Sequence, residues 1–584
     1  MPTRQKQSFL HGALILTVAT ILVKVIGAVF KIPLTLVLGA EGSTHFYTAY
    51  DIFNPVSAIA IAGLPVAVSK LVSENAARGR FKDVKRIRKV AALLFCVTGT
   101  VGFAVTFFFA RPFAELVGNP SGYIPIMAIA PAVLFLCLMS SYRGYYEGLR
   151  NMYPTAISQM VEALVKLVLG YGLSLFIMKL GLEEYDRTGT VFGIAVDSEL
   201  AAKTAVLPFA AAGAIAGVTL STLFGLAYLF IRHLRRGDGI TGKEIAQSPP
   251  ANSKKEILKS LIRISIPVCL GSLVVSLTST IDLASVMNRL SVAVESDAQT
   301  ILNMYASMLP TDITLERLPS FLFGTYKGLP MTIFHLVPAI TTAFGVSALP
   351  AVSSAWAKND KVELKRNVES SLRVTALAAV PAGLGLSALA GPILTLLYNF
   401  SGNGLVGEVA ISTPILSFMG ISVIFVAIAS PVNAILQAIG RADLPVKYMI
   451  VGGTLKLFTN YILVAIPQIN IMGAPVGTLL CYLFIAIASI LSVCRNTHIV
   501  PNMVSVFVKP LVAGLICAAS AYVSYGFLSR VIDARLSTVL AILIAGCIYL
   551  FALFLIRGIS ADDICMLPGG EKIAKVLENR GIIG

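Results

Sequence analysis

Charged and amide side chains occur inside long apolar stretches of this 584-residue sequence. A charge at membrane depth is costly, so such residues are candidates for binding or ion coupling. The residue types favour three roles. Candidates for substrate binding are Lys24, Lys31, Lys327 and Asp51; a buried polar network is expected from Gln159, Glu162, Lys166, Lys456 and Asn460; and Asp282 is the candidate for a coupling ion.

Lys24 and Lys31 are seven residues apart in the first apolar stretch. At about 100° per residue they share one helix face. Two cations on one face suit an anionic group such as a diphosphate in a hydrated cavity, and Lys327 is a further candidate contact for the same group. Pairing with a neighbouring helix, or snorkelling to an interface, stays open as the alternative.

Gln159, Glu162 and Lys166 follow one another at spacings of three and four, so they lie on one helix face. Glu162 and Lys166 can neutralise each other structurally, or the three residues can line a cavity. Lys456 is the approximate repeat partner of Lys166, and Asn460 follows one turn later.

Asp282 offers carboxylate oxygens that suit Na⁺ or a proton, and no metal or organic cofactor is otherwise expected. Asp51 lies toward the outer end of its stretch, where a solvated position is as compatible as a functional one. A lone His335 is expected to bond to a neighbouring helix.

Fourteen apolar stretches must position these residues. Each is long enough to cross the roughly 30 Å hydrocarbon core, which takes about 20 residues, and only helices satisfy their own backbone there. The composition agrees, with 56% hydrophobic and 13% charged residues, against about 25% charged in soluble domains. The expected spans are 9–37, 47–69, 90–110, 123–142, 154–178, 204–230, 261–287, 321–350, 374–397, 411–436, 446–466, 472–493, 506–528 and 537–556.

Basic residues concentrate in alternate connections. Residues 70–89 and 231–263 hold eight Lys/Arg each and 357–373 hold five, whereas 39–46, 399–410 and 467–471 hold none and 288–320 is net acidic. Positively charged loops stay in the cytoplasm, which predicts cytoplasmic termini and an external 288–320 loop. The net charge of +16 therefore indicates contact with anionic lipids rather than nucleic acid.

The chain resembles itself across its middle. The run Gly63–Ser69 before one basic segment matches Ala348–Ser353 before another, and Tyr146–Pro154 matches Leu436–Pro445. A six-helix separation keeps the orientation, so the repeat is parallel. The expected divisions are an N-lobe at 1–232, a cytoplasmic linker at 233–260, a C-lobe at 261–495, and two further helices with a cytoplasmic tail at 496–584. Pro65 and Pro350 are expected hinges.

The sequence does not predict an enzyme. Residues 237–244 spell Gly-x-Gly-x-x-Gly and nearly a P-loop, but Glu244 replaces the final Ser/Thr, and the segment directly follows an apolar span. We interpret it as a flexible turn. Short loops leave no room for an ATPase domain, so energy is expected from an ion gradient, the membrane potential or a downstream reaction.

Several motifs resemble the multidrug/oligosaccharidyl-lipid/polysaccharide exporter superfamily. They are Gly39–Gly42, Gly63–Lys70, Arg143–Gln159 and Met566–Ile573. The nearest branch contains stage V sporulation protein B and the MurJ-type lipid II flippases of Gram-positive bacteria. The resemblance implies a two-lobe transporter of the bacterial cytoplasmic membrane that flips undecaprenyl-diphosphate-linked saccharides outward by alternating access, for cell-wall or polysaccharide synthesis or sporulation. MurJ-type proteins tend to carry arginines in the first helix where this chain has lysines.

Other functions stay open at this point. A cation-coupled multidrug exporter of the same superfamily is one, although spans 13 and 14 and the cationic first helix favour an anionic lipid. A membrane-embedded polymerase or acyltransferase would need large external catalytic loops. A non-transporting scaffold for envelope synthesis would tolerate loss of the buried charges. The saccharide and the oligomeric state stay open.

Overall fold

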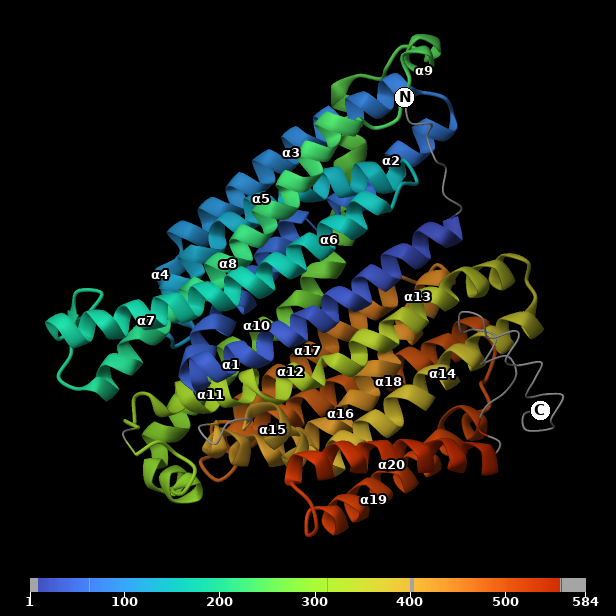
Figure 1. The fold of residues 1–584 in the computed structure, drawn as a ribbon. Coiled ribbons are helices and arrows are strands. Elements are labelled where there is room, and N and C mark those ends of the chain that lie inside the picture. Colours follow the sequence, from blue (N-terminus) through green and yellow to red (C-terminus); the bar gives the residue numbers. More distant parts are fainter. Residues whose placement is uncertain (1–8, 62, 312, 400–403, 557, 559–584) are drawn as a thin grey trace. The chain divides into compact units, whose positions relative to one another are not determined.

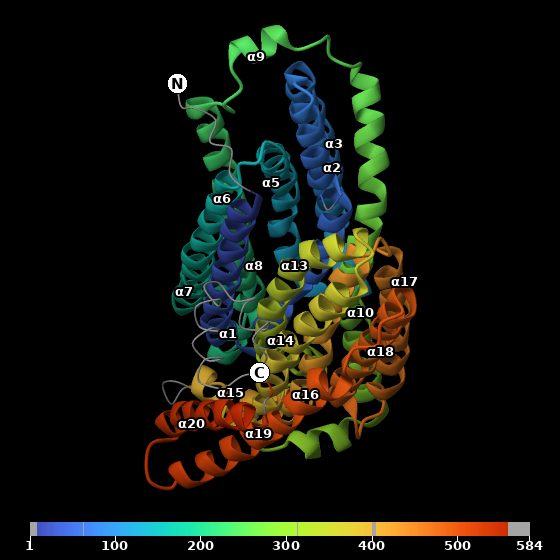
Figure 2. The same cartoon turned by 90° about the vertical axis from the view of Figure 1, so that its right-hand side faces the viewer.

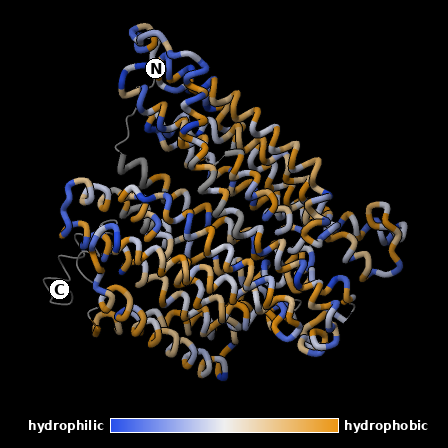
Figure 3. The backbone as a smooth tube through the Cα atoms, turned by 180° about the vertical axis from the view of Figure 1, so that it is seen from behind, coloured by the Kyte–Doolittle hydropathy of each residue, from blue (hydrophilic) through white to orange (hydrophobic). Residues whose placement is uncertain are grey.

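Helices make up nearly all of the computed structural model, which describes residues 9–61, 63–311, 313–399, 404–556 and 558 (Figure 1). One antiparallel pair of short strands, β1 Thr190–Val191 and β2 Ile194–Ala195, is the only sheet within those residues. Hydrophobic residues run along the helices and hydrophilic residues gather at the turns (Figure 3). Ten helical stretches of the described chain are long and apolar enough to span a membrane. The expected all-α, multi-pass fold is confirmed.

The number of spans is less clear-cut than the sequence suggested. Spans 1 and 2 fall in one continuous helical stretch, Val18–Ala77. The stretches 261–287, 321–350 and 446–466 are mostly helical as well, although they are not among the ten. The count of fourteen therefore stays a prediction.

The chain forms two compact units, and unit 1 contains the residues up to Ser291 together with Glu316–Gly324. Its elements are α1 Phe9–Ile61, α2 Leu64–Ala77, α3 Phe81–Phe108, α4 Ala110–Leu116, η1 Pro120–Gly122, α5 Tyr123–Gly148, α6 Tyr153–Val165, η2 Lys166–Gly170, α7 Tyr171–Thr188, β1, β2, α8 Glu199–Arg236, α9 Gly242–Gln247 and most of α10 Lys254–Tyr305.

Unit 2 contains Val292–Leu315 and the residues from Thr325 onward. Its elements are the end of α10, the end of α11 Leu318–Gly328, α12 Pro330–Phe334, α13 Leu336–Ala357, α14 Lys361–Ala388, α15 Ala390–Tyr398, α16 Val406–Ala438, α17 Asp443–Leu463, η3 Asn470–Met472, α18 Gly473–Thr497, η4 Val504–Val508, α19 Lys509–Leu528 and α20 Ala534–Leu555. The C-terminal motif at 566–573 and the tail lie outside the described residues.

The helix pairings within the two units support the internal repeat. In unit 1, α5 packs against α2, α3 and α8, and α2 packs against α3. In unit 2, α16 packs against α13, α14 and α18, and α13 packs against α14. Each unit therefore surrounds one apolar central helix with the same neighbours in the same chain order.

Unit 1 extends beyond the lobe boundary that we expected at residue 260. Hydrogen bonds tie the first part of α10 to the preceding helices: Gly63 N–H to Cys269 Sγ at 3.3 Å, Thr280 Oγ1 to the Asp51 carbonyl at 2.8 Å, and Asn288 Nδ2 to the Leu116 carbonyl at 3.1 Å. Residues 261–291 thus pack as part of the N-terminal unit.

Two expected loops are wrong. The segment 39–46 is helical, and the chain reverses at Gly39 alone, whose φ of 62° and ψ of −167° suit glycine. Within 288–320, α10 continues to Tyr305 with an interruption at Asp297, whose carboxylate accepts a hydrogen bond from the Thr300 N–H at 3.1 Å. That bond caps the helix restart.

The two prolines expected to act as hinges lie in different surroundings. α2 begins at Leu64, so Pro65 lies in a first helical turn, where its missing N–H costs nothing. α13 continues as one helix past Pro350. Hinge motion at either site stays a prediction.

The membrane orientation gives a first testable prediction. A cysteine replacing the exposed Glu295 is expected to react with a membrane-impermeant maleimide added outside intact cells. A cysteine replacing the exposed Arg78 should react after lysis only, because the basic segment 70–89 is expected to face the cytoplasm. Both cysteines are introduced into a variant whose eight native cysteines are replaced, and that variant without a new cysteine is the control. The opposite labelling pattern would overturn the orientation.

Candidate functional site

The reversal at Gly39 brings the first two expected spans together within α1. Lys31 Nζ lies 5.3 Å from the centre of the Tyr47 ring, and the Phe30 and Phe46 rings are 6.1 Å apart. A cation over an aromatic face is attracted by the ring quadrupole. Lys31 is half-buried here, whereas Lys24 on the same helix face is exposed on unit 1.

Lys166 approaches the same aromatic group from the end of α6. Its Nζ lies 5.7 Å from the centre of the Phe30 ring. It is also close enough to Glu162 and Lys31 for their charges to interact. Two lysines that sequence spacing could not connect are therefore neighbours within unit 1.

The sequence suggested Lys166 as the ion-pair partner of Glu162, but in the structure Glu162 pairs with Arg143. Its Oε2 accepts a hydrogen bond from Arg143 Nη2 at 3.0 Å, and Arg143 Nε donates to Ser158 Oγ at 2.9 Å. The side chains of Arg143 and Glu162 are only 14% and 28% exposed. We call Lys31, Arg143, Glu162 and Lys166 the cationic cluster.

A π-helical turn, η2, begins at Lys166 and ends at Gly170. Such turns are rare and frequently occur at functional sites. A Cβ added at Gly170 would lie 2.7 Å from Phe30 Cε2, and one at Gly217 would lie 2.3 Å from Gly170 Cα. The turn and its glycines thus let α1, η2 and α8 approach closely beside Lys166.

Gln159 supplies a hydrogen-bonding group one turn before Glu162. Its Oε1 is buried, and among the described residues it has no hydrogen-bond partner. Buried polar atoms are normally paired with protein or water. An acceptor is therefore available beside the cationic cluster.

Asp51 and Asp282 are both buried in unit 1, at 5% and 1% exposure. The Thr280 Oγ1 bond to the Asp51 carbonyl shows that their helices are in contact. Asp51 is not in the solvated position that the sequence left open. No group of three or more His, Cys, Asp or Glu within the described residues could hold a metal ion.

The remaining candidates lie in unit 2. Lys327 on α11 is 5% exposed, and Lys456 and Asn460 on α17 are 2% and 0% exposed. Asn460 sits against α18, because a Cβ at Gly477 would be 2.2 Å from its Oδ1. The predicted polar network is thus divided: Gln159, Glu162 and Lys166 belong to unit 1, and Lys456 and Asn460 belong to unit 2.

Sequence reasoning missed several residues of this site. Arg143 was visible only as part of the Arg143–Gln159 motif, and nothing in its spacing named Glu162 as its partner. Glu41 forms an ion pair with Arg317 at 3.0 Å within unit 1. The aromatic residues Phe30 and Tyr47 gave no signal among many apolar neighbours.

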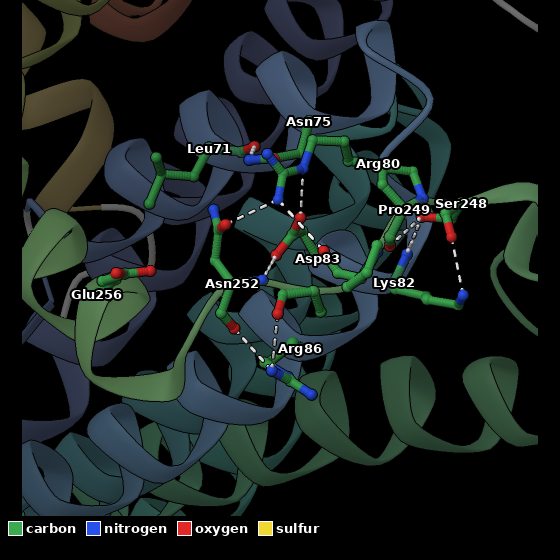
Figure 4. Close-up of polar contacts among 12 residues, drawn as sticks. Leu71, Asn75, Arg80, Lys82, Asp83, Arg86, Ser248, Pro249, Asn252 and Glu256 are labelled. Atoms are coloured by element: carbon green, nitrogen blue, oxygen red, sulfur yellow. Dashed lines mark hydrogen bonds and ion pairs between the residues drawn. The ribbon is translucent and has the colours of Figure 1, made fainter.

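The expected linker is hydrogen-bonded to the helices of unit 1 and belongs to that unit. Residues 237–253, which we call the strap, run from the end of α8 through α9 to α10 (Figure 2). Asp83 accepts hydrogen bonds from Arg80 Nε at 2.6 Å and the Asn252 N–H at 2.7 Å, and Lys82 Nζ donates to the Ser248 carbonyl at 2.8 Å (Figure 4). Thr241 and Glu244 form a capping box at α9. The P-loop-like segment is thus a hydrogen-bonded turn.

Unit 2 contains an apolar cavity of about 330 Å³. It lies among α12 to α15, α19 and α20, and its walls include Leu336, Leu386, Ala521, Gly546 and Tyr549. The Tyr549 hydroxyl donates to the Leu377 carbonyl at 2.7 Å, which fixes α20 on α14. The two C-terminal helices, α19 and α20, therefore complete the wall of this apolar cavity.

Comparison with protein families gives two matches. The profile described as "Polysaccharide biosynthesis protein" matches residues 9–356, and that described as "Lipid II flippase MurJ" matches residues 327–546. Two proteins of Bacillus subtilis (strain 168) are similar along nearly their whole length. Lipid II flippase MurJ is 24% identical, covering 93% of this chain and 94% of the relative; Stage V sporulation protein B is 24% identical, covering 96% and 98%.

Solved structures share the fold. Lipid II flippase MurJ in an inward closed conformation aligns with a TM-score of 0.62 and 14% identity, over 93% of this chain and 98% of that one. A multidrug resistance MATE family transporter of the MOP superfamily, inward-facing, aligns with a TM-score of 0.60 and 14% identity, over 81% and 94%. The resemblance predicted from the motifs is confirmed.

Proposed function

Because the chain belongs to the polysaccharide biosynthesis protein family, we propose that it is a flippase for an undecaprenyl-diphosphate-linked saccharide, either lipid II or a polysaccharide repeat unit. It would carry this lipid from the inner to the outer leaflet of the bacterial cytoplasmic membrane by alternating access. The observation that carries the proposal is the cationic cluster on membrane helices of unit 1.

The charges of this region suit a diphosphate. Lys31, Arg143 and Lys166 contribute three positive charges and Glu162 one negative charge, which leaves 3 − 1 = +2. Cations inside a membrane protein are costly and mark substrate pathways. Bonds from ammonium and guanidinium groups to phosphate are roughly twice as strong as neutral ones. A diphosphate, the charged part of this substrate, is the complementary ligand.

The apolar cavity of unit 2 supports a lipid substrate. Its walls are almost entirely aliphatic and aromatic, so it suits part of a prenyl chain and not a sugar. Burial of a chain there would contribute about 0.8 kcal/mol per CH₂.

Filling that cavity provides a second prediction. Gly546→Leu is expected to lower transport of the full-length prenyl substrate several-fold, because a Cβ at Gly546 meets no atom within 4 Å and the leucine would project into the pocket. Gly526→Leu, on the same helical hairpin and also open around its Cβ, should transport normally. Equal transport by both variants would contradict a role for the cavity.

The energy source is also proposed. The buried Asp282 and Asp51 supply carboxylates for a coupling Na⁺ or proton. An inside-negative membrane potential contributes about 2.3 kcal/mol per charge per 100 mV and assists outward movement of an anionic lipid. The chain itself acts as a transporter and not as an enzyme in this proposal.

The MATE likeness keeps the multidrug exporter as the alternative, supported by fold alone. Complementation distinguishes the two. Expression of this chain is expected to restore growth of Bacillus cells depleted of their lipid II flippase, if lipid II is the cargo. Restoration of a polysaccharide instead would assign the other saccharide, and resistance to cationic drugs with neither rescue would refute the flippase.

A further inference from the structure

Two consecutive tyrosines at the end of α5 hold the start of the strap. The Tyr145 hydroxyl donates to Asp238 Oδ2 at 2.7 Å. The Tyr146 hydroxyl lies 2.8 Å from His233 Nδ1 and donates to the Gly237 carbonyl at 3.1 Å. Both side chains are essentially buried, at 0% and 1% exposure. The hydroxyl groups of this tyrosine pair therefore hold the first residues of the strap in place.

An arginine covers each ring of this pair. The guanidinium carbon of Arg88, on α3, lies 5.9 Å from the centre of the Tyr145 ring, and that of Arg232, on α8, lies 4.8 Å from the centre of the Tyr146 ring. A guanidinium stacked on a ring still needs in-plane acceptors for its five N–H groups. These contacts hold both guanidinium groups beside the tyrosine pair.

Two of these donors are unused. Arg88 Nε and Arg232 Nη1 are buried, and neither has a hydrogen-bond partner in the described part of the chain. Leaving a buried charged donor unsatisfied costs about 1–3 kcal/mol or more. Two such donors, from different helices, are held beside the same tyrosine pair and are available to an anionic ligand.

The local charge is positive even after the strap is counted. Lys85, Arg88 and Arg232 surround a single carboxylate, Asp238, whose side chain is 4% exposed and pairs with Lys85 at 2.6 Å. Burial raises the pKa of Asp238, but its bonds from Lys85, Tyr145 and the Ile240 N–H together bring it below its usual value. With Asp238 charged and His233 neutral, the balance is 3 − 1 = +2.

The second repeat does not have this arrangement. When the repeats are aligned at their exits, Ile435 and Leu436 of α16 occupy the positions of Tyr145 and Tyr146, and both are buried. A tyrosine pair with two arginines is therefore unnecessary for the helix packing that the units share. Its chemistry is particular to unit 1.

We propose that Arg88 and Arg232, at the strap end of unit 1, bind a phosphate group. The ligand is either a free phosphate or the phosphate of an anionic lipid head group, since both offer several oxygens to the two unused donors. This site uses none of the residues of the cationic cluster, and the proposal does not depend on the proposed transport activity.

Inorganic phosphate is the first probe, with the full chain in phosphatidylcholine nanodiscs at constant ionic strength. Thermal unfolding and calorimetry are expected to show stabilising, saturable binding. Arg232→Gln should weaken it at least tenfold, which corresponds to loss of one charge-assisted bond. Arg235→Gln removes the same charge from an exposed position on the same helix end and should bind like the parent. Arg88→Gln repeats the test if Arg232→Gln does not fold.

Phosphatidylglycerol is the second probe, incorporated in nanodiscs and followed by native mass spectrometry. Lipid retained by the parent and by Arg235→Gln, but lost from Arg232→Gln, would assign a head-group phosphate. A response to inorganic phosphate alone would assign the free anion. No saturable response to either probe, or equal weakening in Arg235→Gln and Arg232→Gln, would overturn the site and leave only diffuse surface charge.

Discussion

Replacing Lys31 with glutamine is expected to lower transport of a lipid-linked saccharide by about 10- to 100-fold while the protein stays folded and inserted. Lys31 lies in the helix pair of α1 beside Tyr47 and close to Lys166. A charge-assisted bond contributes about 1.5–3 kcal/mol, which sets that range. Glutamine keeps most of the side-chain volume and removes only the charge.

The comparison variants separate charge from surface effects. Lys31→Arg is expected to keep part of the activity, since a cation persists with a different geometry. Lys179→Gln, which removes an exposed lysine paired with Glu183 at 3.5 Å on α7, should transport normally. The exposed Lys24 is also expected to contribute, and Lys24→Ala should lower transport. Normal transport by Lys31→Gln, with insertion verified, would refute the cationic cluster as the substrate site.

Breaking the pair between Arg143 and Glu162 is expected to destabilise unit 1. Arg143→Leu leaves the half-buried Glu162 carboxylate without its partner, and such losses cost about 3–5 kcal/mol in a fully buried pair, so about 3 kcal/mol is expected here. Replacing both residues with leucine should recover most of the stability, because a well-packed apolar pair substitutes for a buried ion pair at little or no cost.

Transport and stability should separate in the double variant. Arg143→Leu/Glu162→Leu is expected to unfold in detergent at nearly the parent's temperature, yet to flip substrate poorly, because the diphosphate would lose one cation. Thermal unfolding by intrinsic fluorescence and flipping in vesicles are the two measurements. A double variant as unstable as Arg143→Leu would show that the pair has a structural role beyond charge neutralisation.

Much of the fold is readable from the sequence because lipid imposes simple rules. Most of each expected span lies on helix within the described residues, and the repeat seen at Tyr146–Pro154 and Leu436–Pro445 reappears as matching helix pairings around α5 and α16. The boundaries were less predictable. Gly-Ala-Glu-Gly reads as a loop, but a single glycine at positive φ reverses the chain, and helix resumes at once.

The sequence predicted the charged residues of the candidate site but not the residues that they contact. Membrane-depth charges such as Lys31, Glu162 and Lys166 stand out by type, because charged residues are rare in apolar runs. Their partners do not stand out. Helical spacing relates residues on one helix face, whereas Arg143 reaches Glu162 from α5, and Lys166 reaches Phe30 across the α1–α6 contact. The π-turn at Lys166 also shifts the face that any 3.6-residue period would assign.

The strap shows the same limit. Its glycines predict a turn, and Gly237 and Gly239 do have positive φ values. Sequence gave no reason to expect that Asp238 would bond Tyr145, or that Asp83 would hold Asn252. Such contacts join segments more than ninety residues apart, so only the folded chain reveals them.

Flipping by the purified protein tests the central proposal most directly. Vesicles containing the full chain would carry a fluorescent undecaprenyl-diphosphate disaccharide, and a membrane-impermeant reductant added outside would quench label exposed in the outer leaflet. The expected result is quenching of nearly all the label with the parent, and of only about half with empty vesicles. Within the time that the parent needs for completion, Lys31→Gln should quench little more than the empty vesicles. Half-quenching by the parent, with the protein folded and correctly inserted, would contradict the account.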